Sequence, residues 1–377
     1  MRNVAVFFGG KSCENEISVL TGVFVLNLLD REKYVPLPVY IHTDGTMYTS
    51  KKMTDLDVFR KNKYENFQKI FFDGATVYEM KEKKGKIKRL LNVDVALNCC
   101  HGGLGEGGGV SAMMEWCGVP FASPDLTGSG VFMDKGMTKL VMRALNIPTL
   151  EYIRVNERDY EKRGAFLLKT IDARLKYPVV IKPAHLGSSI GIAVAKNDLE
   201  AKRAIEDAFA LDNRVIIERY LEEKQDVNCA AYILNGEICV SEPEAAFGNG
   251  LYTFEEKYVK RQSDRGVLAG GKMQNEGGRV LLSGELREKI RSYTKTIYKR
   301  MNLQGVVRMD YLISEGKAYL CEVNTVPGSL AYYLFCERIV DARRFFSDLI
   351  EEAMSSAEKG KRVLATGILK SVSWNRK

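Results

Sequence analysis

Short apolar runs alternate with helical segments over the N-terminal part of the chain. Three of these runs predict buried strands: NVAVFF (3–8), YVPLPVYI (34–41) and VDVALNCC (93–100). Between them, the pattern predicts a helix from about Glu14 to Leu29 and another apolar helix over 109–118. Strands that alternate with helices are typical of a parallel sheet. The sequence therefore predicts the α/β fold class, with a parallel-sheet domain over residues 1–125.

The pattern changes after this region. Residues 133–146 predict a helix, and from Pro178 onward short strands and hairpins dominate. Two further helices are expected over 198–210 and 284–301, and residues 338–357 have the spacing of an amphipathic terminal helix. With 377 residues, the chain has room for two or three domains.

Composition indicates a globular protein, with 45% apolar and 28% charged residues. No apolar run approaches the roughly 18 residues of a membrane span, and the first run is too short for a secretory signal. Eight cysteines without a C-x-x-C pair favour reduced thiols in a cytoplasmic protein, and three histidines make a histidine-rich zinc site improbable. We therefore expect a cytoplasmic protein with no membrane partner.

The net charge of +8 raises the question of a nucleic-acid partner. Its densest basic run, KEKKGKIKR (81–89), has no interleaved aromatic residues and is typical of a solvated hairpin turn. The remaining positive charge is spread along the chain, which suits a small anionic ligand. We expect no nucleic-acid partner.

One glycine-rich segment suggests a different function. GLGEGG (103–108) follows a predicted strand and fits the G-x-G-x-x-G pattern of dinucleotide-binding oxidoreductases. However, that strand is not the first in the chain, and Asp125 lies in a proline-flanked loop rather than at a strand end. The pattern needs its structural context, so this alternative is the weaker one.

The segment 305–328, GVVRMDYLISEGKAYLCEVNTVPG, predicts a hairpin that concentrates charge. With a turn of about two residues, its two strands would place four polar side chains on one face: Arg308, Asp310, Glu322 and Asn324. The other face would hold Val307, Met309, Tyr311, Cys321 and Val323. Two opposed carboxylates repel each other, and an oxygen-only ligand set suits Mg²⁺ bound together with substrate phosphates. The alternative is an exposed salt-bridge face around Arg308.

A second segment, PVVIKPAHLGSSIGIAVAK (178–196), resembles a phosphate loop but has its lysine before the glycines. Lys182 on a strand, with 187–189 at a hairpin tip, could lay an ammonium and backbone N–H groups over phosphates. Lys135 heads the preceding helix, and the backbone beside Glu218 in VIIERYL (215–221) could read an adenine edge. Together these features predict a lid over ATP.

The residues resemble the ATP-grasp superfamily and, within it, the D-alanine–D-alanine ligases. Eight segments carry the resemblance, in the order of the family: GGKSCENEIS (9–18), HGGLGEGGG (101–109), TGSGVFMDKGMTK (127–139), VVIKPAHLGSSIGI (179–192), IERYLEEKQD (217–226), EEKYVK (255–260), RMD (308–310) and EVNTVPG (322–328). The resemblance implies a three-domain ATP-grasp architecture. Its expected divisions are an N-terminal domain (1–125), a central domain (126–212), a C-terminal domain (213–360) and a tail (361–377).

The resemblance also implies the nucleotide and metal ligands. Three lysines would bind phosphates: Lys135, Lys182 and Lys257. Adenine and ribose would contact Glu218, the backbone around Leu221, and Asp226. Two Mg²⁺ ions, with Mn²⁺ as an alternative, would be held by Asp310, Glu322 and Asn324.

For the substrate, the resemblance implies that Glu14 holds the ammonium of the first D-alanine and is linked by hydrogen bonds to Ser188 and Tyr258. Arg308 and the Gly328 N–H would stabilise the oxyanion, and His101 would belong to the substrate site. Tyr258 favours an amine acceptor over a hydroxy acid, although a tyrosine can also serve only to pack a loop.

The implied activity joins two D-alanines at the expense of ATP, through a D-alanyl phosphate, for peptidoglycan precursors, in a protein expected to be a homodimer. The alternatives are a related ligase for D-Ala and D-Ser or another amino-acid pair, and a non-catalytic nucleotide-binding protein. Three segments differ from the family pattern: SLAYYLF after Gly328, Gly108 in place of an acidic residue, and the long segment that follows Tyr258.

Overall fold

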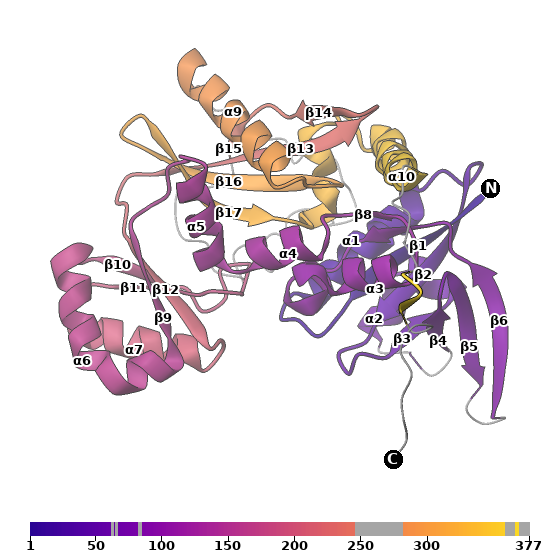
Figure 1. The fold of residues 1–377 in the computed structure, drawn as a ribbon, viewed down its shortest axis with the longest axis horizontal. Coiled ribbons are helices and arrows are strands. Elements are labelled where there is room, and N and C mark those ends of the chain that lie inside the picture. The colour runs from indigo at the N-terminus through magenta and orange to yellow at the C-terminus, as the bar shows by residue number, and fades with distance from the viewer. Residues whose placement is uncertain (62–63, 65–66, 82–84, 246–281, 359–365, 369–377) are drawn as a thin grey trace.

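The computed structural model describes residues 1–61, 64, 67–81, 85–245, 282–358 and 366–368. Within these residues, three β-sheets lie in three regions of the molecule, each with its own helices (Figure 1). None of the described helices combines the length and apolar character needed to cross a bilayer. The mixed α/β fold class is confirmed, while the expected domain boundaries stay a prediction.

The N-terminal sheet has eight strands and contains the predicted parallel core. In spatial order the strands are β6 (Lys86–Asn92), β5 (Thr76–Lys81), β4 (Gln68–Asp73), β3 (Met47–Thr49), β2 (Tyr34–Ile41), β1 (Arg2–Gly9), β7 (Val95–Asn98) and β8 (Phe121–Ala122). Strands β2, β1, β7 and β8 are parallel, as expected. Strands β3 to β6 extend the sheet as antiparallel neighbours. Short connections join β2 to β3, β4 to β5 and β5 to β6, whereas η1 and α2 lie between β3 and β4. The described residues of the basic run 81–89 lie at the end of β5 and in and just before β6, which pair as the predicted hairpin.

Several short helices accompany this sheet: α1 (Asn15–Leu28), η1 (Lys51–Thr54), α2 (Asp57–Arg60), the π-helical turn η3 (Gly105–Gly109) and α3 (Val110–Trp116). Helix α1 begins directly after β1 and buries one side against it, with Val19, Val23 and Leu26 in the core. The glycine-rich segment 103–108 forms helical turns that lead directly to α3.

The middle sheet is antiparallel, with strand order β11 (Ala193–Ala195), β10 (Val179–Pro183), β12 (Arg214–Arg219) and β9 (Tyr152–Asn156). Helices α6 (Glu157–Arg174) and α7 (Asp198–Phe209) pack against it, at the lower left of Figure 1. Helix α7 was predicted, whereas α6 was not. Helices α4 (Leu126–Met133) and α5 (Lys135–Ala144) lead from the N-terminal region to this sheet.

The third sheet contains the predicted charged hairpin. Its strands run in the order β14 (Glu237–Val240), β13 (Gln225–Leu234), β16 (Val307–Ser314) and β17 (Lys317–Asn324), and β15 (Glu244–Ala245) pairs with β13. Helix α9 (Gly284–Arg300), close to its predicted bounds, packs on the sheet with Ile290 and Ile297 fully buried.

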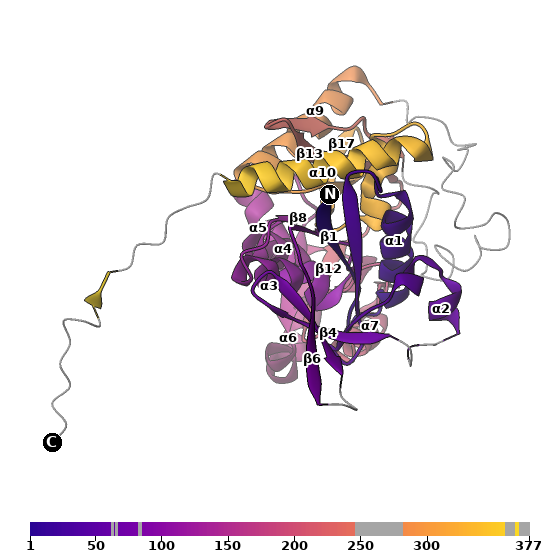
Figure 2. The ribbon, with the colours of Figure 1, turned by 90° about the vertical axis from the view of Figure 1, so that its right-hand side faces the viewer.

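The last elements return to the N-terminal sheet. They are η5 (Gly328–Leu334), η6 (Ile339–Asp341) and α10 (Ala342–Glu358), the predicted terminal helix. Helix α10 packs against β7 and β8 of the first sheet and against β13 of the third (Figure 2). The rings of Phe24 and Tyr332 lie 5.0 Å apart, in the core that also holds Phe346. The loop that follows the charged hairpin is thus fixed against α1.

Candidate active site

The charged hairpin has the predicted pairs but an unpredicted bulge. Ser314 pairs with Lys317 across a two-residue turn, in which Glu315 and Gly316 have φ values of 50° and 71°. Continuing that register would place Asp310 opposite Cys321. A shift between Asp310 and Tyr311 instead pairs Asp310 with Glu322.

The bulge corrects one prediction. Cys321 was expected on the apolar face, but its sulfur lies 3.9 Å from Nζ of Lys182, so its side chain belongs to the polar site. The extra residue in the bulged strand re-aims the side chain. The other predicted apolar residues, Val307, Met309, Tyr311 and Val323, lie in the core beneath α9.

The polar face is tightly hydrogen-bonded. Arg308 donates two hydrogen bonds to Asp310, at 2.7 and 2.8 Å, and Asn324 donates to the same carboxylate at 2.9 Å. Arg308 also donates to the hydroxyl of Tyr333 at 3.1 Å. The expected salt bridge is therefore present, but the side chains of Arg308 and Asp310 are only 18% and 19% exposed. This face lines a site rather than open solvent.

The donor set of this face fits a magnesium ion. Asp310, Glu322 and Asn324 offer only hard oxygen ligands, and Glu322 stands directly across from Asp310 in the strand pair. No three His, Cys, Asp or Glu side chains form a metal cluster within the described residues. Two carboxylates and an amide suit Mg²⁺ that takes its remaining ligands from phosphates and water.

A buried ion triplet lies beside this hairpin, on the middle sheet. Glu218 of β12 is 3% exposed and lies 2.5 Å from Nζ of Lys139 and 2.5 Å from Nζ of Lys182. Burial opposes ionisation of Glu218, but the two lysines outweigh it and lower its pKa to about 2. Burial likewise opposes the charged form of Lys182, yet Cys321 and Glu218 raise the pKa of this lysine, so it stays an ammonium.

Another of the predicted lysines, Lys135, stands at the beginning of α5. Lys135 donates its Nζ to the carbonyl of Leu186 at 2.6 Å and lies 3.9 Å from Oε2 of Glu322. It therefore connects the glycine-serine loop with the carboxylates of the hairpin. The three lysines 135, 139 and 182 and the two glutamates 218 and 322 leave one surplus positive charge, which favours an anionic ligand.

The loop between β10 and β11 reaches the N-terminal domain. Ser188 and Ser189 adopt positive φ values of 52° and 61°, and the hydroxyl of Ser188 donates to Oε1 of Glu14. A Cβ atom at Gly187 would meet the Glu14 carboxylate at 2.8 Å, so a larger residue here would displace that side chain. The predicted link between Glu14 and Ser188 is present, while Lys257 and Tyr258 lie outside the described residues.

A further carboxylate near Glu14 belongs to Glu106, which lies in the glycine-rich segment 103–108. It accepts hydrogen bonds from the N–H of Gly102 at 2.7 Å and of Val326 at 3.3 Å. Burial raises the pKa of Glu106 to about 7, and the charge of Glu14 adds to that effect, while the two N–H groups oppose it. Glu106 thereby joins the N-terminal segment to the strand end that precedes Pro327.

The predicted substrate residue His101 is buried, and burial lowers its pKa to about 4. Its Nε2 shares a 2.8 Å hydrogen bond with the hydroxyl of Thr21, which also accepts from the N–H of Ser329 at 3.1 Å. Three successive residues after Gly328, residues 329–331, have left-handed φ values of 50°, 53° and 49°. Such values cost non-glycine residues free energy, and they set the path of the unusual SLAYYLF segment.

The residues expected near adenine occupy the connection between β12 and β13. Leu221 follows β12. On β13, the carboxylate oxygen Oδ2 of Asp226 lies 3.4 Å from Nζ of Lys224. Glu218 is the penultimate residue of β12, and its carboxylate is enclosed between two lysines. Its assignment to adenine and ribose stays a prediction.

Several residues of the site were not predicted. Lys139 lies one helical turn beyond Lys135, so the spacing K-x-x-x-K was a signal that it faces the same side. Asp134 was placed inside the helix predicted over 133–146, but the helix begins at Lys135 and Asp134 is its N-cap, a role for which aspartate is typical. No local signal points to Glu106, Thr21 or Tyr333, whose partners lie far away in the sequence.

Two family models match most of the chain. "D-ala D-ala ligase N-terminus" matches residues 3–124, and "D-ala D-ala ligase C-terminus" matches residues 141–355. The chain belongs to the D-ala D-ala ligase family. Membership in this family disfavours the dinucleotide-dependent oxidoreductase alternative.

Named relatives of this ligase family agree with the match. The chain is 32% identical to the D-alanine–D-alanine ligase of Thermosipho africanus over 336 residues, which covers 89% of this chain and 88% of that one. It is 30% identical to the enzyme of the same name from Thermosipho melanesiensis over 377 residues, with 98% and 99% covered.

Solved structures of ligases share the fold. The D-alanine–D-alanine ligase of Helicobacter pylori superposes with a TM-score of 0.74 at 23% identity, covering 95% of this chain and 98% of that one. The VanG D-Ala:D-Ser ligase of Enterococcus faecalis gives a TM-score of 0.72 at 24% identity, with 94% and 99% covered. The three-domain ATP-grasp architecture expected from the sequence is therefore confirmed.

Proposed function

We propose that this protein is an ATP-dependent, ADP-forming ligase that joins two D-alanines for peptidoglycan precursor synthesis. Membership in the ligase family supports the proposal, and so do the named relatives that align over nearly the whole chain. The single structural observation that supports the proposal most directly is the hydrogen bond from Ser188 to Glu14. This bond joins the loop beside the lysines to the start of α1, so that a nucleotide and an amino acid would be enclosed by one loop.

The ligase chemistry must activate a carboxylate, which is a poor electrophile. In the proposed first step, an oxygen of the first D-alanine carboxylate attacks the γ-phosphorus of ATP, and the bond to the β–γ bridging oxygen breaks. ADP leaves and a D-alanyl phosphate forms. Positive charge that faces the transferring group lowers the barrier to this step. Lys135 and Lys182 belong to the cluster that has surplus positive charge. Together with Lys257, they are assigned to binding the phosphates.

In the second step, the amine of the second D-alanine attacks the carbonyl carbon of the acyl phosphate. The carbon–oxygen bond to phosphate breaks, phosphate leaves, and the amine loses a proton as the peptide bond forms. The negative oxygen of the tetrahedral intermediate needs preorganised donors. Arg308, oriented by Asp310 and Tyr333, and the N–H of Gly328 are assigned to this role.

The remaining assignments concern binding. Glu14 would hold the ammonium of the first D-alanine, with Ser188 and Tyr258 linked to it and His101 nearby. Leu221, Asp226 and the backbone at Glu218 would contact adenine and ribose. Two Mg²⁺ ions, or Mn²⁺, would be held by Asp310, Glu322 and Asn324, and would neutralise phosphate charge when bound.

We further propose that the protein acts in the cytoplasm, where ATP is available. All eight cysteines are unpaired in the structure, which agrees with a reducing compartment. The proposed homodimer rests on the resemblance alone, and light scattering of the purified chain tests it.

The function is tested by measuring ADP and phosphate release with D-alanine, D-serine, D-lactate or L-alanine, and by identifying the products by mass spectrometry. We expect release to require D-alanine and the main product to be D-alanyl-D-alanine. A dominant D-alanyl-D-serine product would identify the alternative ligase. ATP binding without any amino-acid-dependent turnover would identify a non-catalytic protein.

A further inference from the structure

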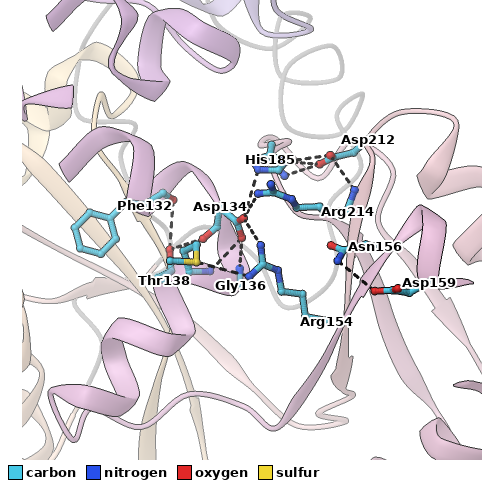
Figure 3. A network of polar contacts seen from close by, with 11 residues as sticks. Phe132, Asp134, Gly136, Thr138, Arg154, Asn156, Asp159, His185, Asp212 and Arg214 are labelled. Atoms are coloured by element: carbon cyan, nitrogen blue, oxygen red, sulfur yellow. Dashed lines mark hydrogen bonds and ion pairs between the residues drawn. The ribbon is translucent and has the colours of Figure 1, made fainter. Parts of the chain in front are cut away.

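The glycine-serine loop begins with a histidine that stands between two carboxylates (Figure 3). Nδ1 of His185 lies 3.0 Å from both oxygens of Asp212, and its own backbone N–H donates to Oδ2 of Asp212 at 2.7 Å. On the other side of the ring, Nε2 lies 3.5 Å from Oδ2 of Asp134. The two carboxylates come from separate segments, one from the start of α5 and one from the turn before β12.

This placement favours the imidazolium form of His185. A neutral imidazole carries one N–H and one lone pair, so one of its nitrogens would turn a lone pair toward a carboxylate. The hydrogen bonds to Asp134 and Asp212 raise the pKa of His185 to about 9, while burial opposes this increase. The other charged groups at this site are Arg154 of β9 and Arg214 of β12, which both pair with Asp134.

Asp134 in turn fixes the beginning of α5. Its Oδ1 accepts from the N–H groups of Gly136 and Met137, at 2.8 and 3.1 Å. Its Oδ2 accepts from Arg154 at 3.0 Å and Arg214 at 2.8 Å. The side chain caps the helix in a fixed orientation, directly before Lys135.

The loop and the helix are also joined on both sides of the histidine. The backbone N–H of Lys135 donates to the carbonyl of Ala184 at 3.0 Å, and its Nζ donates to the carbonyl of Leu186 at 2.6 Å. His185 therefore lies at the centre of a junction among the loop, helix α5 and the turn before β12. A change in its charge acts on the position of Lys135 and of the loop tip.

We propose that His185 is a positioning residue, whose charged ring holds the glycine-serine loop and Lys135 in the geometry that binds the phosphates of ATP. The inference rests on the proposed phosphate-binding role of Lys135. His185 itself would not contact the phosphates, but it would affect the affinity for ATP. Lys135 is joined directly to this junction, whereas the D-alanine site is reached only through the contact of Ser188 with Glu14, so the KM for ATP should rise more than the KM for D-alanine.

Two variants separate charge from shape. His185→Gln removes the charge and should raise the KM for ATP about tenfold at pH 7.5, as small displacements of binding groups do. The KM for D-alanine should rise less, by no more than about threefold, since the loop reaches that site only through the contact of Ser188 with Glu14. His185→Arg restores a cation with several donors and should recover most of the ATP affinity. His42→Gln is the matched control, because that histidine also faces an aspartate, Asp44, but lies in the N-terminal sheet region.

The pH dependence adds a readout that a merely structural role would not change. As pH rises through about 9, the wild-type ring loses its charge, so the KM for ATP should rise more steeply than in His185→Arg. In NMR spectra of the full-length protein, which has three histidines, the signal lost in His185→Arg should titrate near pH 9. This measurement needs no glutamine variant and stands even if that variant fails to fold.

The inference is overturned if His185→Gln leaves the KM for ATP unchanged, if the KM values for ATP and D-alanine rise equally, or if the histidine titrates near 6.5. Lys135→Ala separates this inference from the function on which it rests. An increased KM for ATP in Lys135→Ala with no effect of His185→Gln contradicts only the role of His185. No effect of Lys135→Ala on ATP contradicts the phosphate assignment itself.

Discussion

Nζ of Lys182 lies 2.5 Å from Oε2 of Glu218, in a side-chain environment that is almost closed to solvent. Lys139 holds the other oxygen of the same carboxylate at the same distance. One carboxylate between two ammonium groups does not neutralise both of them. The free energy cost of burying the unmatched charge is recovered if an anion binds next to it. This relationship connects the fold of the middle sheet to nucleotide binding.

Replacing Lys182 with alanine should therefore weaken ATP binding. A charge-assisted contact contributes about 1.5–3 kcal/mol, so the dissociation constant for ATP should rise about 10- to 100-fold. Isothermal titration calorimetry measures this directly. Lys196→Ala, at an exposed position after the same hairpin, is the control and should bind ATP normally. Equal affinity of Lys182→Ala and wild type would show that Lys182 only compensates Glu218.

The carboxylate pair of the hairpin predicts a metal requirement. Glu322→Gln keeps the shape of the side chain but removes a charge opposite Asp310, so turnover should fall at least about 100-fold while the protein remains folded. The Mg²⁺ concentration that gives half-maximal activity should also rise in any residual activity. The assay is phosphate release against Mg²⁺ concentration, with circular dichroism as the folding check.

Glu315→Gln, in the exposed turn of the same hairpin, is the matched control and should keep wild-type activity. Full wild-type activity after removal of divalent cations by a chelator, or an unimpaired Glu322→Gln variant, contradicts the metal assignment.

The hairpin also shows what sequence can and cannot predict. The pairing of Asp310 with Glu322 was predicted from a turn of about two residues, and it is confirmed, although the two-residue turn gives this pair only together with a bulge. The bulge that produces this pairing was not predictable, because its only sequence signature is one additional residue in a strand. For the same reason Cys321 was assigned to the wrong face. Strand alternation predicts faces only up to the first irregularity.

Other parts of the structure lacked a local signal. Helix α6 has a single fully buried apolar position, Ile171, so its apolar periodicity is too weak to distinguish it from a loop. The contacts of His185 with Asp134 and Asp212 join three segments that are distant in sequence. By contrast, β2 was predicted with its observed bounds, because its apolar run is continuous and is flanked by Lys33 and His42. Long-range charge networks need the tertiary fold before they can be recognised.

Glu106 predicts a pH dependence of stability. Its pKa is raised to about 7 in the folded protein, above the usual value of 4.5, so folding favours its protonated form. The associated stability is complete below pH 4.5 and is lost as pH rises to about 7. Glu106→Gln removes this titration. Wild type should therefore lose about 2 kcal/mol of unfolding free energy relative to the variant over this interval, allowing for partial contact with solvent.

Urea denaturation of both proteins at several pH values between 4.5 and 8 measures this difference. Glu115→Gln, at an exposed position on the nearby helix α3, is the control and should parallel the wild type. A constant difference between wild type and Glu106→Gln across the pH range would show that folding does not raise the pKa of Glu106.

The central claim is that the protein forms a D-alanyl phosphate before the peptide bond. D-alanine labelled with ¹⁸O in both carboxylate oxygens tests it most directly, because the attacking carboxylate oxygen stays with phosphorus when phosphate leaves. The account predicts that the phosphate released from ATP carries one ¹⁸O atom for each dipeptide formed, as read by the isotope shift in ³¹P NMR. Dipeptide formation accompanied by unlabelled phosphate would contradict it.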